Sequence, residues 1–137
     1  FAIIAFAFRN RQMVFPRGRV VGGSHTINFN IYNRGNRHDF DYWANYYGLQ
    51  EWSFENVLPY FQRTENNTNR RYVEAAPNYH STRGQVEVSS PPNPDPILLK
   101  YMEGWNLQGL PYTDVNGPNQ LGTSKFNSFG SYRNNSY

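Results

Sequence analysis

Hydrophobic residues recur with a helical period in the first third of the chain. The spacing i, i+3, i+4 and i+7 is that of one face of an α-helix, and it predicts a helix near 38–48. Asn36 is a candidate N-cap for this helix, and Gly48 is a natural stop. The predicted buried face consists of Phe40, Trp43, Ala44 and Tyr47.

Two more stretches carry the same period. A helix near 53–64 starts after the capping residue Ser53, and we expect Pro59 to kink it or to split it in two. A helix near 96–108 follows Asp95, a good cap. We expect the apolar faces of both helices to be core. These faces are formed by Phe54, Val57, Leu58 and Phe61 in the first, and by Ile97, Leu98, Tyr101, Met102 and Trp105 in the second.

The remaining segments predict few strands. Residues 1–8 (FAIIAFAF) are an apolar run, too short for a membrane-spanning helix of about 20 residues, and we interpret them as a buried strand. Residues 85–88 read as a strand that follows a turn. The polar, Asn-rich segment 64–78 predicts a surface loop. The fold class expected from this pattern is α+β, mostly helix and loop.

Composition adds limits of its own. The 137 residues suffice for one core, and the absence of cysteine excludes disulfides and thiolate metal sites. A net charge of +3 permits binding to nucleic acid but does not argue for it. Because the chain starts at Phe1 rather than Met, we expect it to be a processed product or a piece of a larger protein.

The most suggestive chemistry lies in residues 16–28 (PRGRVVGGSHTIN). The adjacent Gly22 and Gly23 allow positive φ and a close approach of the backbone to a ligand. The peptide N–H groups there, with the Ser24 hydroxyl beside them, can bind a phosphate or a flat polar ring. By itself this pattern is more typical of a plain turn.

This stretch resembles the first signature of the glucose–methanol–choline (GMC) oxidoreductases, which are FAD-dependent enzymes acting on alcohols and sugars. The likeness extends from about residue 13 to about residue 122. The segments that carry it are 16–24 (PRGRVVGGS), 27–28 (IN), 31–35 (IYNRG), 39–44 (DFDYWA), 52–61 (WSFENVLPYF), 79–88 and 114–117 (DVNG).

The resemblance implies a fragment of the Rossmann-like FAD-binding domain and of the substrate domain. In these terms residues 1–137 are a single partial N-terminal region, with a flavin-binding loop at 16–35 and the start of substrate-domain elements within 36–137. The resemblance also implies an FAD cofactor. The cofactor-binding residues carried over by position are Gly22, Gly23, Ser24, Asn28, Phe29, Asn30 and Ile31.

The implied reaction is oxidation of a CH–OH group of a small alcohol or sugar, with hydride passing to flavin N5. Neither the G-x-G-x-x-G dinucleotide fingerprint nor the family's catalytic His pair occurs in this sequence. We therefore expect the isolated chain to be inactive and to contain no catalytic residue of its own. Its expected partners are FAD, the substrate and the remainder of the parent polypeptide, with no nucleic acid and no membrane.

Two alternatives stay open at this point. The chain could be a non-catalytic relative that serves as a binding or structural module. Less favoured is a basic, aromatic protein that binds single-stranded nucleic acid.

Three candidate residues are assigned structural rather than catalytic roles. His80 matches a structural turn of the family rather than a catalytic base. Asp39 and Asp41 are interpreted as capping charges rather than an acid–base pair.

Overall fold

The structure is a computed structural model, and it describes residues 2–5, 11–91, 93–125 and 128–129. The chain forms two compact units, residues 1–30 and residues 31–137. The α+β class predicted from the sequence is confirmed, because helices dominate and the strands are few and short.

The first unit begins with an antiparallel pair of strands. Strands β1 (Ala2–Ala5) and β2 (Arg11–Val14) pair with Ala2 opposite Val14. The strand predicted over 1–8 is therefore present at 2–5, while the rest of that prediction lies outside the described residues. A short 3₁₀ helix, η2 (Gly23–Thr26), follows further along the chain.

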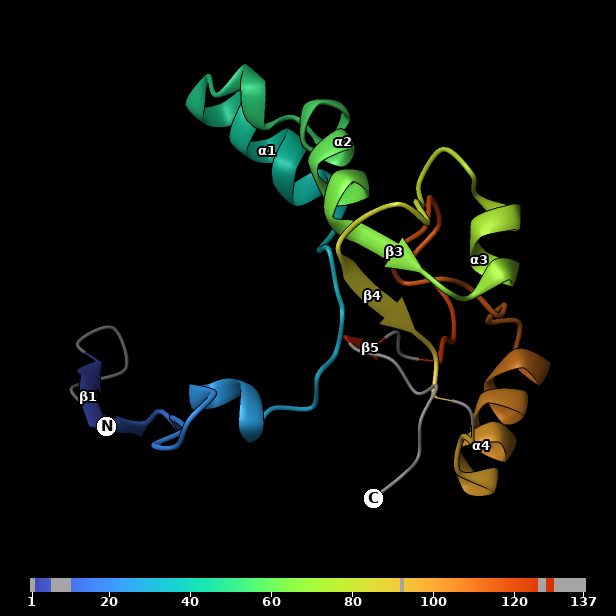
Figure 1. The fold of residues 1–137 in the computed structure, drawn as a ribbon, viewed down its shortest axis with the longest axis horizontal. Helices are drawn as coiled ribbons and strands as arrows, with labels where there is room; N and C mark the ends of the chain where they lie inside the picture. Colours follow the sequence, from blue (N-terminus) through green and yellow to red (C-terminus); the bar gives the residue numbers. More distant parts are fainter. Residues whose placement is uncertain (1, 6–10, 92, 126–127, 130–137) are drawn as a thin grey trace. The chain divides into compact units, whose positions relative to one another are not determined.

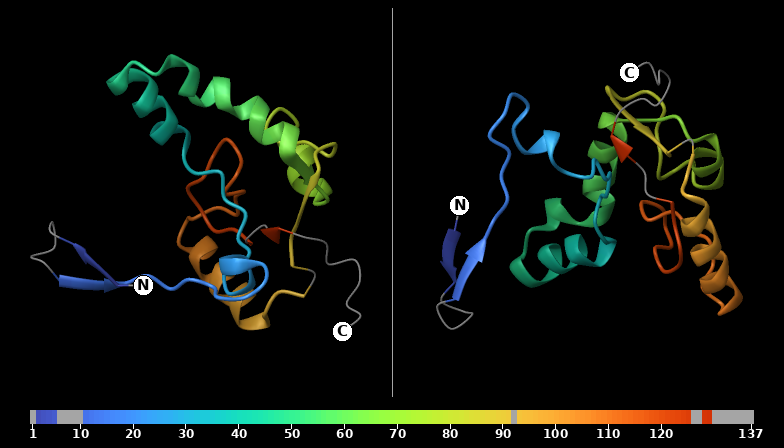
Figure 2. Two further views of the ribbon diagram at one scale, coloured as in Figure 1. Left: turned by 60° about the vertical axis from the view of Figure 1, so that its left-hand side comes forward. Right: turned by 90° about the horizontal axis from the view of Figure 1, so that it is seen from below.

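The second unit holds most of the secondary structure (Figure 1). Its elements in order are α1 (Arg37–Tyr47), η3 (Gln50–Trp52), α2 (Phe54–Thr64), β3 (Glu65–Asn67), α3 (Arg70–Ala75), β4 (Val86–Ser89), α4 (Pro96–Leu107) and β5 (Ser128–Phe129). The three helices predicted from periodicity and the strand predicted at 85–88 are confirmed to within one residue at each end. In this unit α1 and α2 lie at a different end from α4 in all the views (Figures 1 and 2).

Helices α1 and α2 pack through aromatic rings, and a side chain of α1 caps α2. The Asn36 side chain accepts a hydrogen bond from the His38 N–H at 2.8 Å, which confirms it as the N-cap of α1. Phe40 of α1 meets Phe61 of α2 edge to face, with 5.8 Å between ring centroids. Asp41 accepts from the backbone N–H of Phe54 at 2.9 Å, so this carboxylate caps the neighbouring helix α2.

Helix α2 differs from its prediction in one respect. It continues through Pro59 as one helix of 11 residues, so of the two expected outcomes, a kink or a split, the split does not occur. Proline removes only one backbone donor, and the packing of the flanking aromatic residues against α1 holds the helix on both sides of it.

The three-stranded sheet has the order β3-β4-β5. Strands β3 and β4 run parallel with Glu65 opposite Val86, and β5 is antiparallel to β4 with Phe129 opposite Val88. The prediction of a surface loop over 64–78 is wrong, because this segment forms β3 and α3. Its polar side chains at Glu65 and Asn67 are buried rather than solvated.

The predicted apolar face of α4 is not core in this chain. Only Met102 is buried, while Ile97 is 77% exposed and Tyr101 63% exposed. Tyr101 and Trp105 instead contact each other on the helix surface, with ring centroids 6.0 Å apart. The apolar face of α1 is likewise only partly covered, since Ala44 is buried and Tyr47 is exposed.

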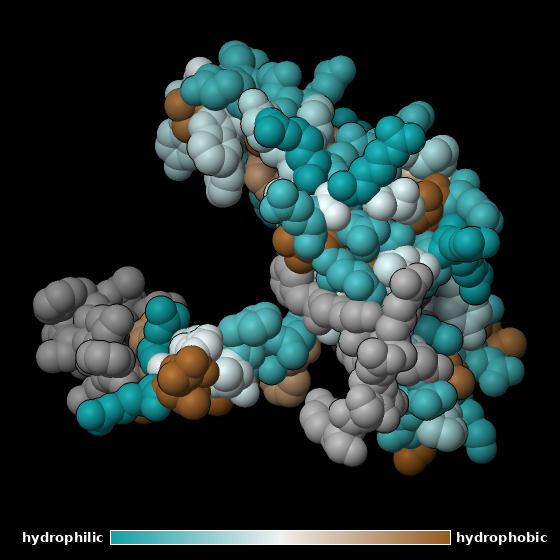
Figure 3. Space-filling model, viewed as in Figure 1, coloured by the Kyte–Doolittle hydropathy of each residue, from teal (hydrophilic) through white to brown (hydrophobic). Residues whose placement is uncertain are grey.

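The buried interior of the second unit is unusually polar. Among the described residues, seven buried polar or charged side chains stand beside five buried hydrophobic ones. On the face drawn in Figure 3, exposed hydrophobic residues are scattered among hydrophilic ones. No helix in the described ranges is both long enough and apolar enough to span a membrane.

Candidate functional site

The glycine-rich loop of the first unit has the backbone conformation predicted from the sequence. Gly22 and Gly23 have φ values of 93° and 60°, in the left-handed region that favours glycine. A Cβ on Gly23 would meet no atom within 4 Å, so this side of the loop is open to a ligand. The turn therefore has the left-handed glycine conformations that the sequence predicted for this loop.

A third glycine, which the sequence reasoning passed over, holds this turn closed. The N–H of Gly18 donates to the hydroxyl oxygen of Ser24 at 3.1 Å. A Cβ on Gly18 would lie 2.1 Å from the carbonyl oxygen of Gly23, which real atoms do not tolerate. The alternation of Gly and Arg in residues 16–19 was the only sequence signal for this close approach.

The other predicted cofactor residues follow in the next turn. The Asn28 side-chain oxygen accepts a hydrogen bond from the N–H of Asn30 at 2.7 Å. The side-chain oxygen of Asn30 is buried without a hydrogen-bond partner, and Asn30 has a positive φ of 51°. Phe29 is 91% exposed.

Ile31 does not belong to the same unit as the other six predicted residues. The boundary between the units falls between Asn30 and Ile31. Ile31 forms an isolated antiparallel bridge with Ser128, and so it anchors the start of the second unit. The other six, Gly22, Gly23, Ser24, Asn28, Phe29 and Asn30, lie in the first unit.

The strongest electrostatic feature of the second unit is a buried ion pair between Arg34 and Glu65. The Arg34 Nη2 and Glu65 Oε2 atoms are 2.6 Å apart, and both side chains are almost fully excluded from solvent. The guanidinium group also donates to the backbone oxygen of Tyr79 and to the hydroxyl of Tyr32. Every charged atom of the pair thus has a partner, which buried charges require.

His80 extends the ion pair toward a second carboxylate. Its Nδ1 is 3.1 Å from Glu65 Oε1, and its Nε2 is 2.7 Å from Asp114 Oδ2. Burial by itself would lower the pKa of His80, but the contacts with Asp114 and Glu65 outweigh it and raise the pKa from 6.5 to about 9. His80 is therefore a cation at neutral pH, held between two anions.

The same contacts fix the ionisation of Glu65. Burial works to raise the pKa of this carboxyl, but the hydrogen bond with His80, the Arg34 charge and the N–H of Ser81 together lower it. Glu65 is consequently ionised at neutral pH although its side chain has no exposed surface. The four side chains at positions 34, 65, 80 and 114 form one charge-balanced network, which we call the buried ionic network.

Asn116 ties this network to the backbone. Its Oδ1 accepts from the N–H of Arg34 at 2.8 Å, and its Nδ2 donates to the backbone oxygen of Tyr32 at 3.1 Å. Asp114 in turn accepts from the N–H of Asn116 at 2.9 Å. These bonds join two segments that lie more than 80 residues apart in the sequence.

The contacts of His80 agree with the structural role expected for it. The imidazolium is held between Glu65 and Asp114 and has no exposed surface from which to serve a substrate. Sequence reasoning missed Glu65 and Asp114 as its partners, and it missed Arg34 as the ion-pair partner of Glu65. Two of these residues do fall in segments that carry the family resemblance, 31–35 and 114–117, and that was the available signal. No group of three or more metal-ligating side chains occurs within the part of the chain that the structure describes.

Comparison with known proteins covers nearly the whole chain. The family described as GMC oxidoreductase matches residues 3–136. An oxygen-dependent choline dehydrogenase of Xanthomonas campestris pv. campestris (strain B100) is 42% identical over 115 residues, which is 82% of this chain and 20% of that protein. A protein of the same name from Chromohalobacter salexigens is 38% identical over 123 residues, or 88% of this chain and 21% of that protein. The chain thus spans about one fifth of the length of these relatives.

Solved structures share the fold. Pyridoxine 4-oxidase from Mesorbium loti superposes with a TM-score of 0.77 at 24% identity, over 90% of this chain and 24% of that chain. An FAD-dependent oxidoreductase from Chaetomium thermophilum gives a TM-score of 0.71 at 29% identity, over 87% of this chain and 22% of the other. The family match, the relatives and the shared fold agree with the sequence signature, and this chain belongs to the GMC oxidoreductase family.

Proposed function

We propose that the protein to which this chain belongs is an FAD-dependent oxidoreductase that oxidises a CH–OH group of a small alcohol or sugar. The chain supplies part of the flavin cradle and the start of the substrate domain. The observation that carries this proposal is the loop with Gly22 and Gly23 in left-handed conformations, within a chain of the GMC family. Choline is the first substrate to test, because relatives at about 40% identity are named for it.

The residues of the loop fit a dinucleotide cofactor. The paired glycines let the backbone come within contact distance of a pyrophosphate, and the Ser24 oxygen already accepts from Gly18, so its O–H is directed elsewhere and can donate. The Asn28 amide and the unsatisfied oxygen of Asn30 supply a donor and an acceptor for the edge of a polar ring. When bound, FAD supplies the hydride acceptor of the reaction.

The buried ionic network has a supporting role in this proposal. It fixes Arg34 and the segment that follows the loop to the sheet and to residues 114–116. We assign no proton transfer with substrate to His80, because its two nitrogens already face carboxylates. The base that accepts the substrate hydroxyl proton is expected in a part of the parent protein outside this sequence.

The proposal is tested by flavin retention in the full-length parent protein. Gly23→Val should abolish retention, because a branched side chain at positive φ is strained by about 1–3 kcal/mol before any ligand contact is lost. Asn28→Ala should weaken retention less, since it removes hydrogen bonds worth about 0.5–1.5 kcal/mol. The exposed His25→Ser is the matched control in the same 3₁₀ helix and should keep its flavin.

The measurement is flavin absorbance per mole of folded protein for the three variants. Flavin retention by Gly23→Val equal to that of the unmodified parent would contradict the assignment of the loop. We further expect the isolated 137-residue chain to reduce no dye acceptor with choline, glucose or simple alcohols. Flavin-dependent turnover by homogeneous isolated chain would show that the catalytic residues lie within it.

A further inference from the structure

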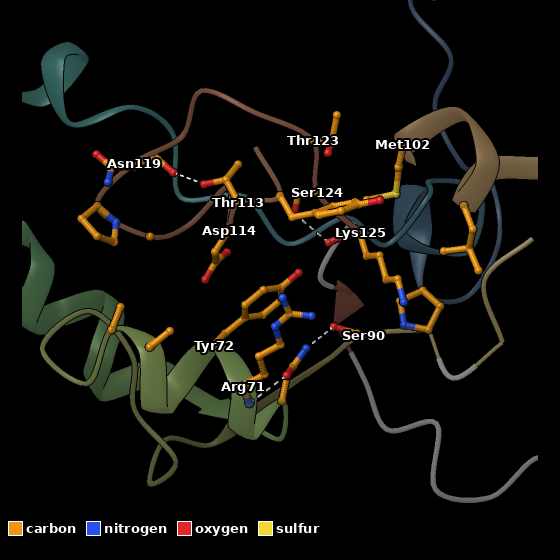
Figure 4. A pocket seen from close by; sticks show the side chains of 18 of the residues that line it. Arg71, Tyr72, Ser90, Met102, Thr113, Asp114, Asn119, Thr123, Ser124 and Lys125 are labelled. Atoms are coloured by element: carbon orange, nitrogen blue, oxygen red, sulfur yellow. Dashed lines mark hydrogen bonds between the residues drawn. The ribbon is translucent and has the colours of Figure 1, made fainter. Parts of the chain in front are cut away.

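The second unit contains a cavity that neither the flavin cradle nor the proposed reaction uses. Its volume is about 640 Å³, within the range of small-molecule sites. It lies between α3, α4 and the segment 112–125 (Figure 4). All the residues that line it belong to the second unit, so its shape does not depend on the glycine-rich loop.

Two cationic side chains line this cavity without an ion-pair partner among the described residues. Arg71 projects from α3, and Lys125 comes from the segment that follows Thr123 (Figure 4). None of the ion pairs in the described part of the chain includes either side chain. Unpaired cations at the wall of a cavity attract an anionic ligand.

The acidic side chains at the cavity do not cancel this charge. Asp114 lines the wall, but its carboxylate is already paired with the protonated His80 at 2.7 Å. Glu103 of α4 is then the remaining anion in the lining, against the two cations. Counted together with His80, the partner of Asp114, the charged groups of the lining carry one net positive charge at neutral pH.

The rest of the lining combines apolar surface with one unsatisfied hydroxyl. Leu99 and Met102 of α4 and the rings of Tyr72 and Tyr112 offer a surface for an apolar group. The hydroxyl oxygen of Thr123 is buried and has no hydrogen-bond partner. Native proteins rarely leave such a group unpaired, so this hydroxyl is available to a water molecule or to a polar atom of a ligand.

We propose that this cavity binds a small organic anion, a molecule that joins one negatively charged group to an apolar ring or chain. The anionic group pairs with Arg71 and Lys125, and the apolar part lies against Leu99, Met102 and the tyrosine rings. This site is independent of the proposed oxidoreductase activity. Its test uses no flavin, so the two proposals can fail separately.

The experiment titrates the complete 137-residue chain with three probes and follows backbone amide shifts by two-dimensional NMR. Phenyl phosphate carries the anion and the ring, inorganic phosphate only the anion, and benzyl alcohol only the ring. We expect saturable shifts in α3, α4 and 112–125 with phenyl phosphate. The two single-feature probes should each bind at least about tenfold more weakly, which corresponds to about 1.4 kcal/mol.

Variants locate the charge contacts. Arg71→Gln and Lys125→Gln should each weaken the binding of phenyl phosphate by about tenfold, the effect expected for loss of one charge-assisted hydrogen bond. Arg70→Gln is the matched control, since it removes the same charge from the adjacent, exposed position of α3 outside the cavity lining. Thr123→Val should weaken binding without unfolding the chain, because the hydroxyl that it removes has no partner in the protein.

The proposal is overturned by any of three results. Unchanged affinity in both Arg71→Gln and Lys125→Gln would show that the cations do not contact the ligand. An equal loss in Arg70→Gln would show diffuse attraction to a basic surface. Equal affinity for one of the single-feature probes would remove either the charge or the apolar part from the description of the ligand.

Discussion

Raising the pH should destabilise this chain through one side chain, His80. The pKa of His80 is raised from 6.5 to about 9, since its contacts with Asp114 and Glu65 outweigh the effect of burial. The folded-state pKa lies above the unfolded value, so protonated His80 contributes its full stabilisation below about pH 6.5. This contribution is lost as the pH rises through about 9.

The size of the effect follows from the two pKa values. Each tenfold change in proton affinity is worth about 1.4 kcal/mol, so a pKa that moves from 6.5 to about 9 corresponds to about 3 kcal/mol. The His80 side chain has no exposed surface, and solvent therefore screens its ion pairs little. A domain of this size is stable by about 5–15 kcal/mol in total, so the loss should be easy to measure.

The assay is urea unfolding of the chain between about pH 6 and about pH 10, compared with His80→Gln. The unmodified chain should lose about 3 kcal/mol more than the variant over this range. His38→Gln, at an exposed position of α1, is the control and should follow the unmodified chain. Where His80→Gln is too unstable to fold, NMR titration of the His80 ring in the unmodified chain gives the pKa directly. Parallel pH profiles for both chains, or a ring pKa near 6.5, would refute the reasoning.

Four further outcomes are expected, the first three measured by urea unfolding. Gly84→Ala should cost about 1–3 kcal/mol or more, because its Cβ would lie 2.2 Å from backbone atoms of Thr64, whereas Gly104→Ala in open space on α4 should stabilise the chain by about 1 kcal/mol. Asn116→Ala should cost about 2–4 kcal/mol, since it leaves two backbone groups of the facing segment without their partner, and a cost below about 0.5 kcal/mol would argue against a stabilising role for these two hydrogen bonds. Acidification should remove the contribution of Glu65 as the pH falls below its unfolded value of 4.5 and through the lowered folded-state pKa, a loss that Glu65→Gln should not show. Gly18→Ala should disturb the glycine-rich loop and lower flavin retention by the parent, and normal retention would contradict the close approach described for this residue.

Local patterns predicted the helices well. The period of apolar residues and the caps at Asn36 and Asp95 located α1 and α4 to within one residue at each end. Caps and periodicity act over a few residues, so a single sequence contains all the information they need. The left-handed turn at Gly22 and Gly23 was predictable for the same reason.

The buried ionic network could not be predicted in this way. Strand β3 has the sequence ENN, which is typical of a loop, and it becomes a strand because Glu65 and Asn67 alternate inward onto polar partners. Those partners lie 15 to 31 residues from Glu65, with no periodic relation to it. Buried polar positions look like surface positions in a sequence until their partners are known.

The prediction that the apolar face of α4 is buried was wrong for a different reason. Periodicity reports which side of a helix is apolar, but it does not report what covers that side. In this chain Ile97 and Tyr101 face solvent although the pattern is that of a core helix. Local sequence therefore predicted the element and its face correctly, and misjudged only its environment.

The hydrogen bonds between Asn116 and the segment at Arg34 determine the order in which contacts can form during synthesis. The two residues are 82 positions apart, and ribosomes add about 5–20 residues per second. Asn116 is therefore synthesised about 4–16 s after Arg34. Helices α1 and α2, by contrast, meet through residues only 13 to 21 positions apart and can pair as soon as both emerge. During synthesis the helical pair is thus available early, while Arg34 stays hydrated and open to other contacts until the last of its partners is translated.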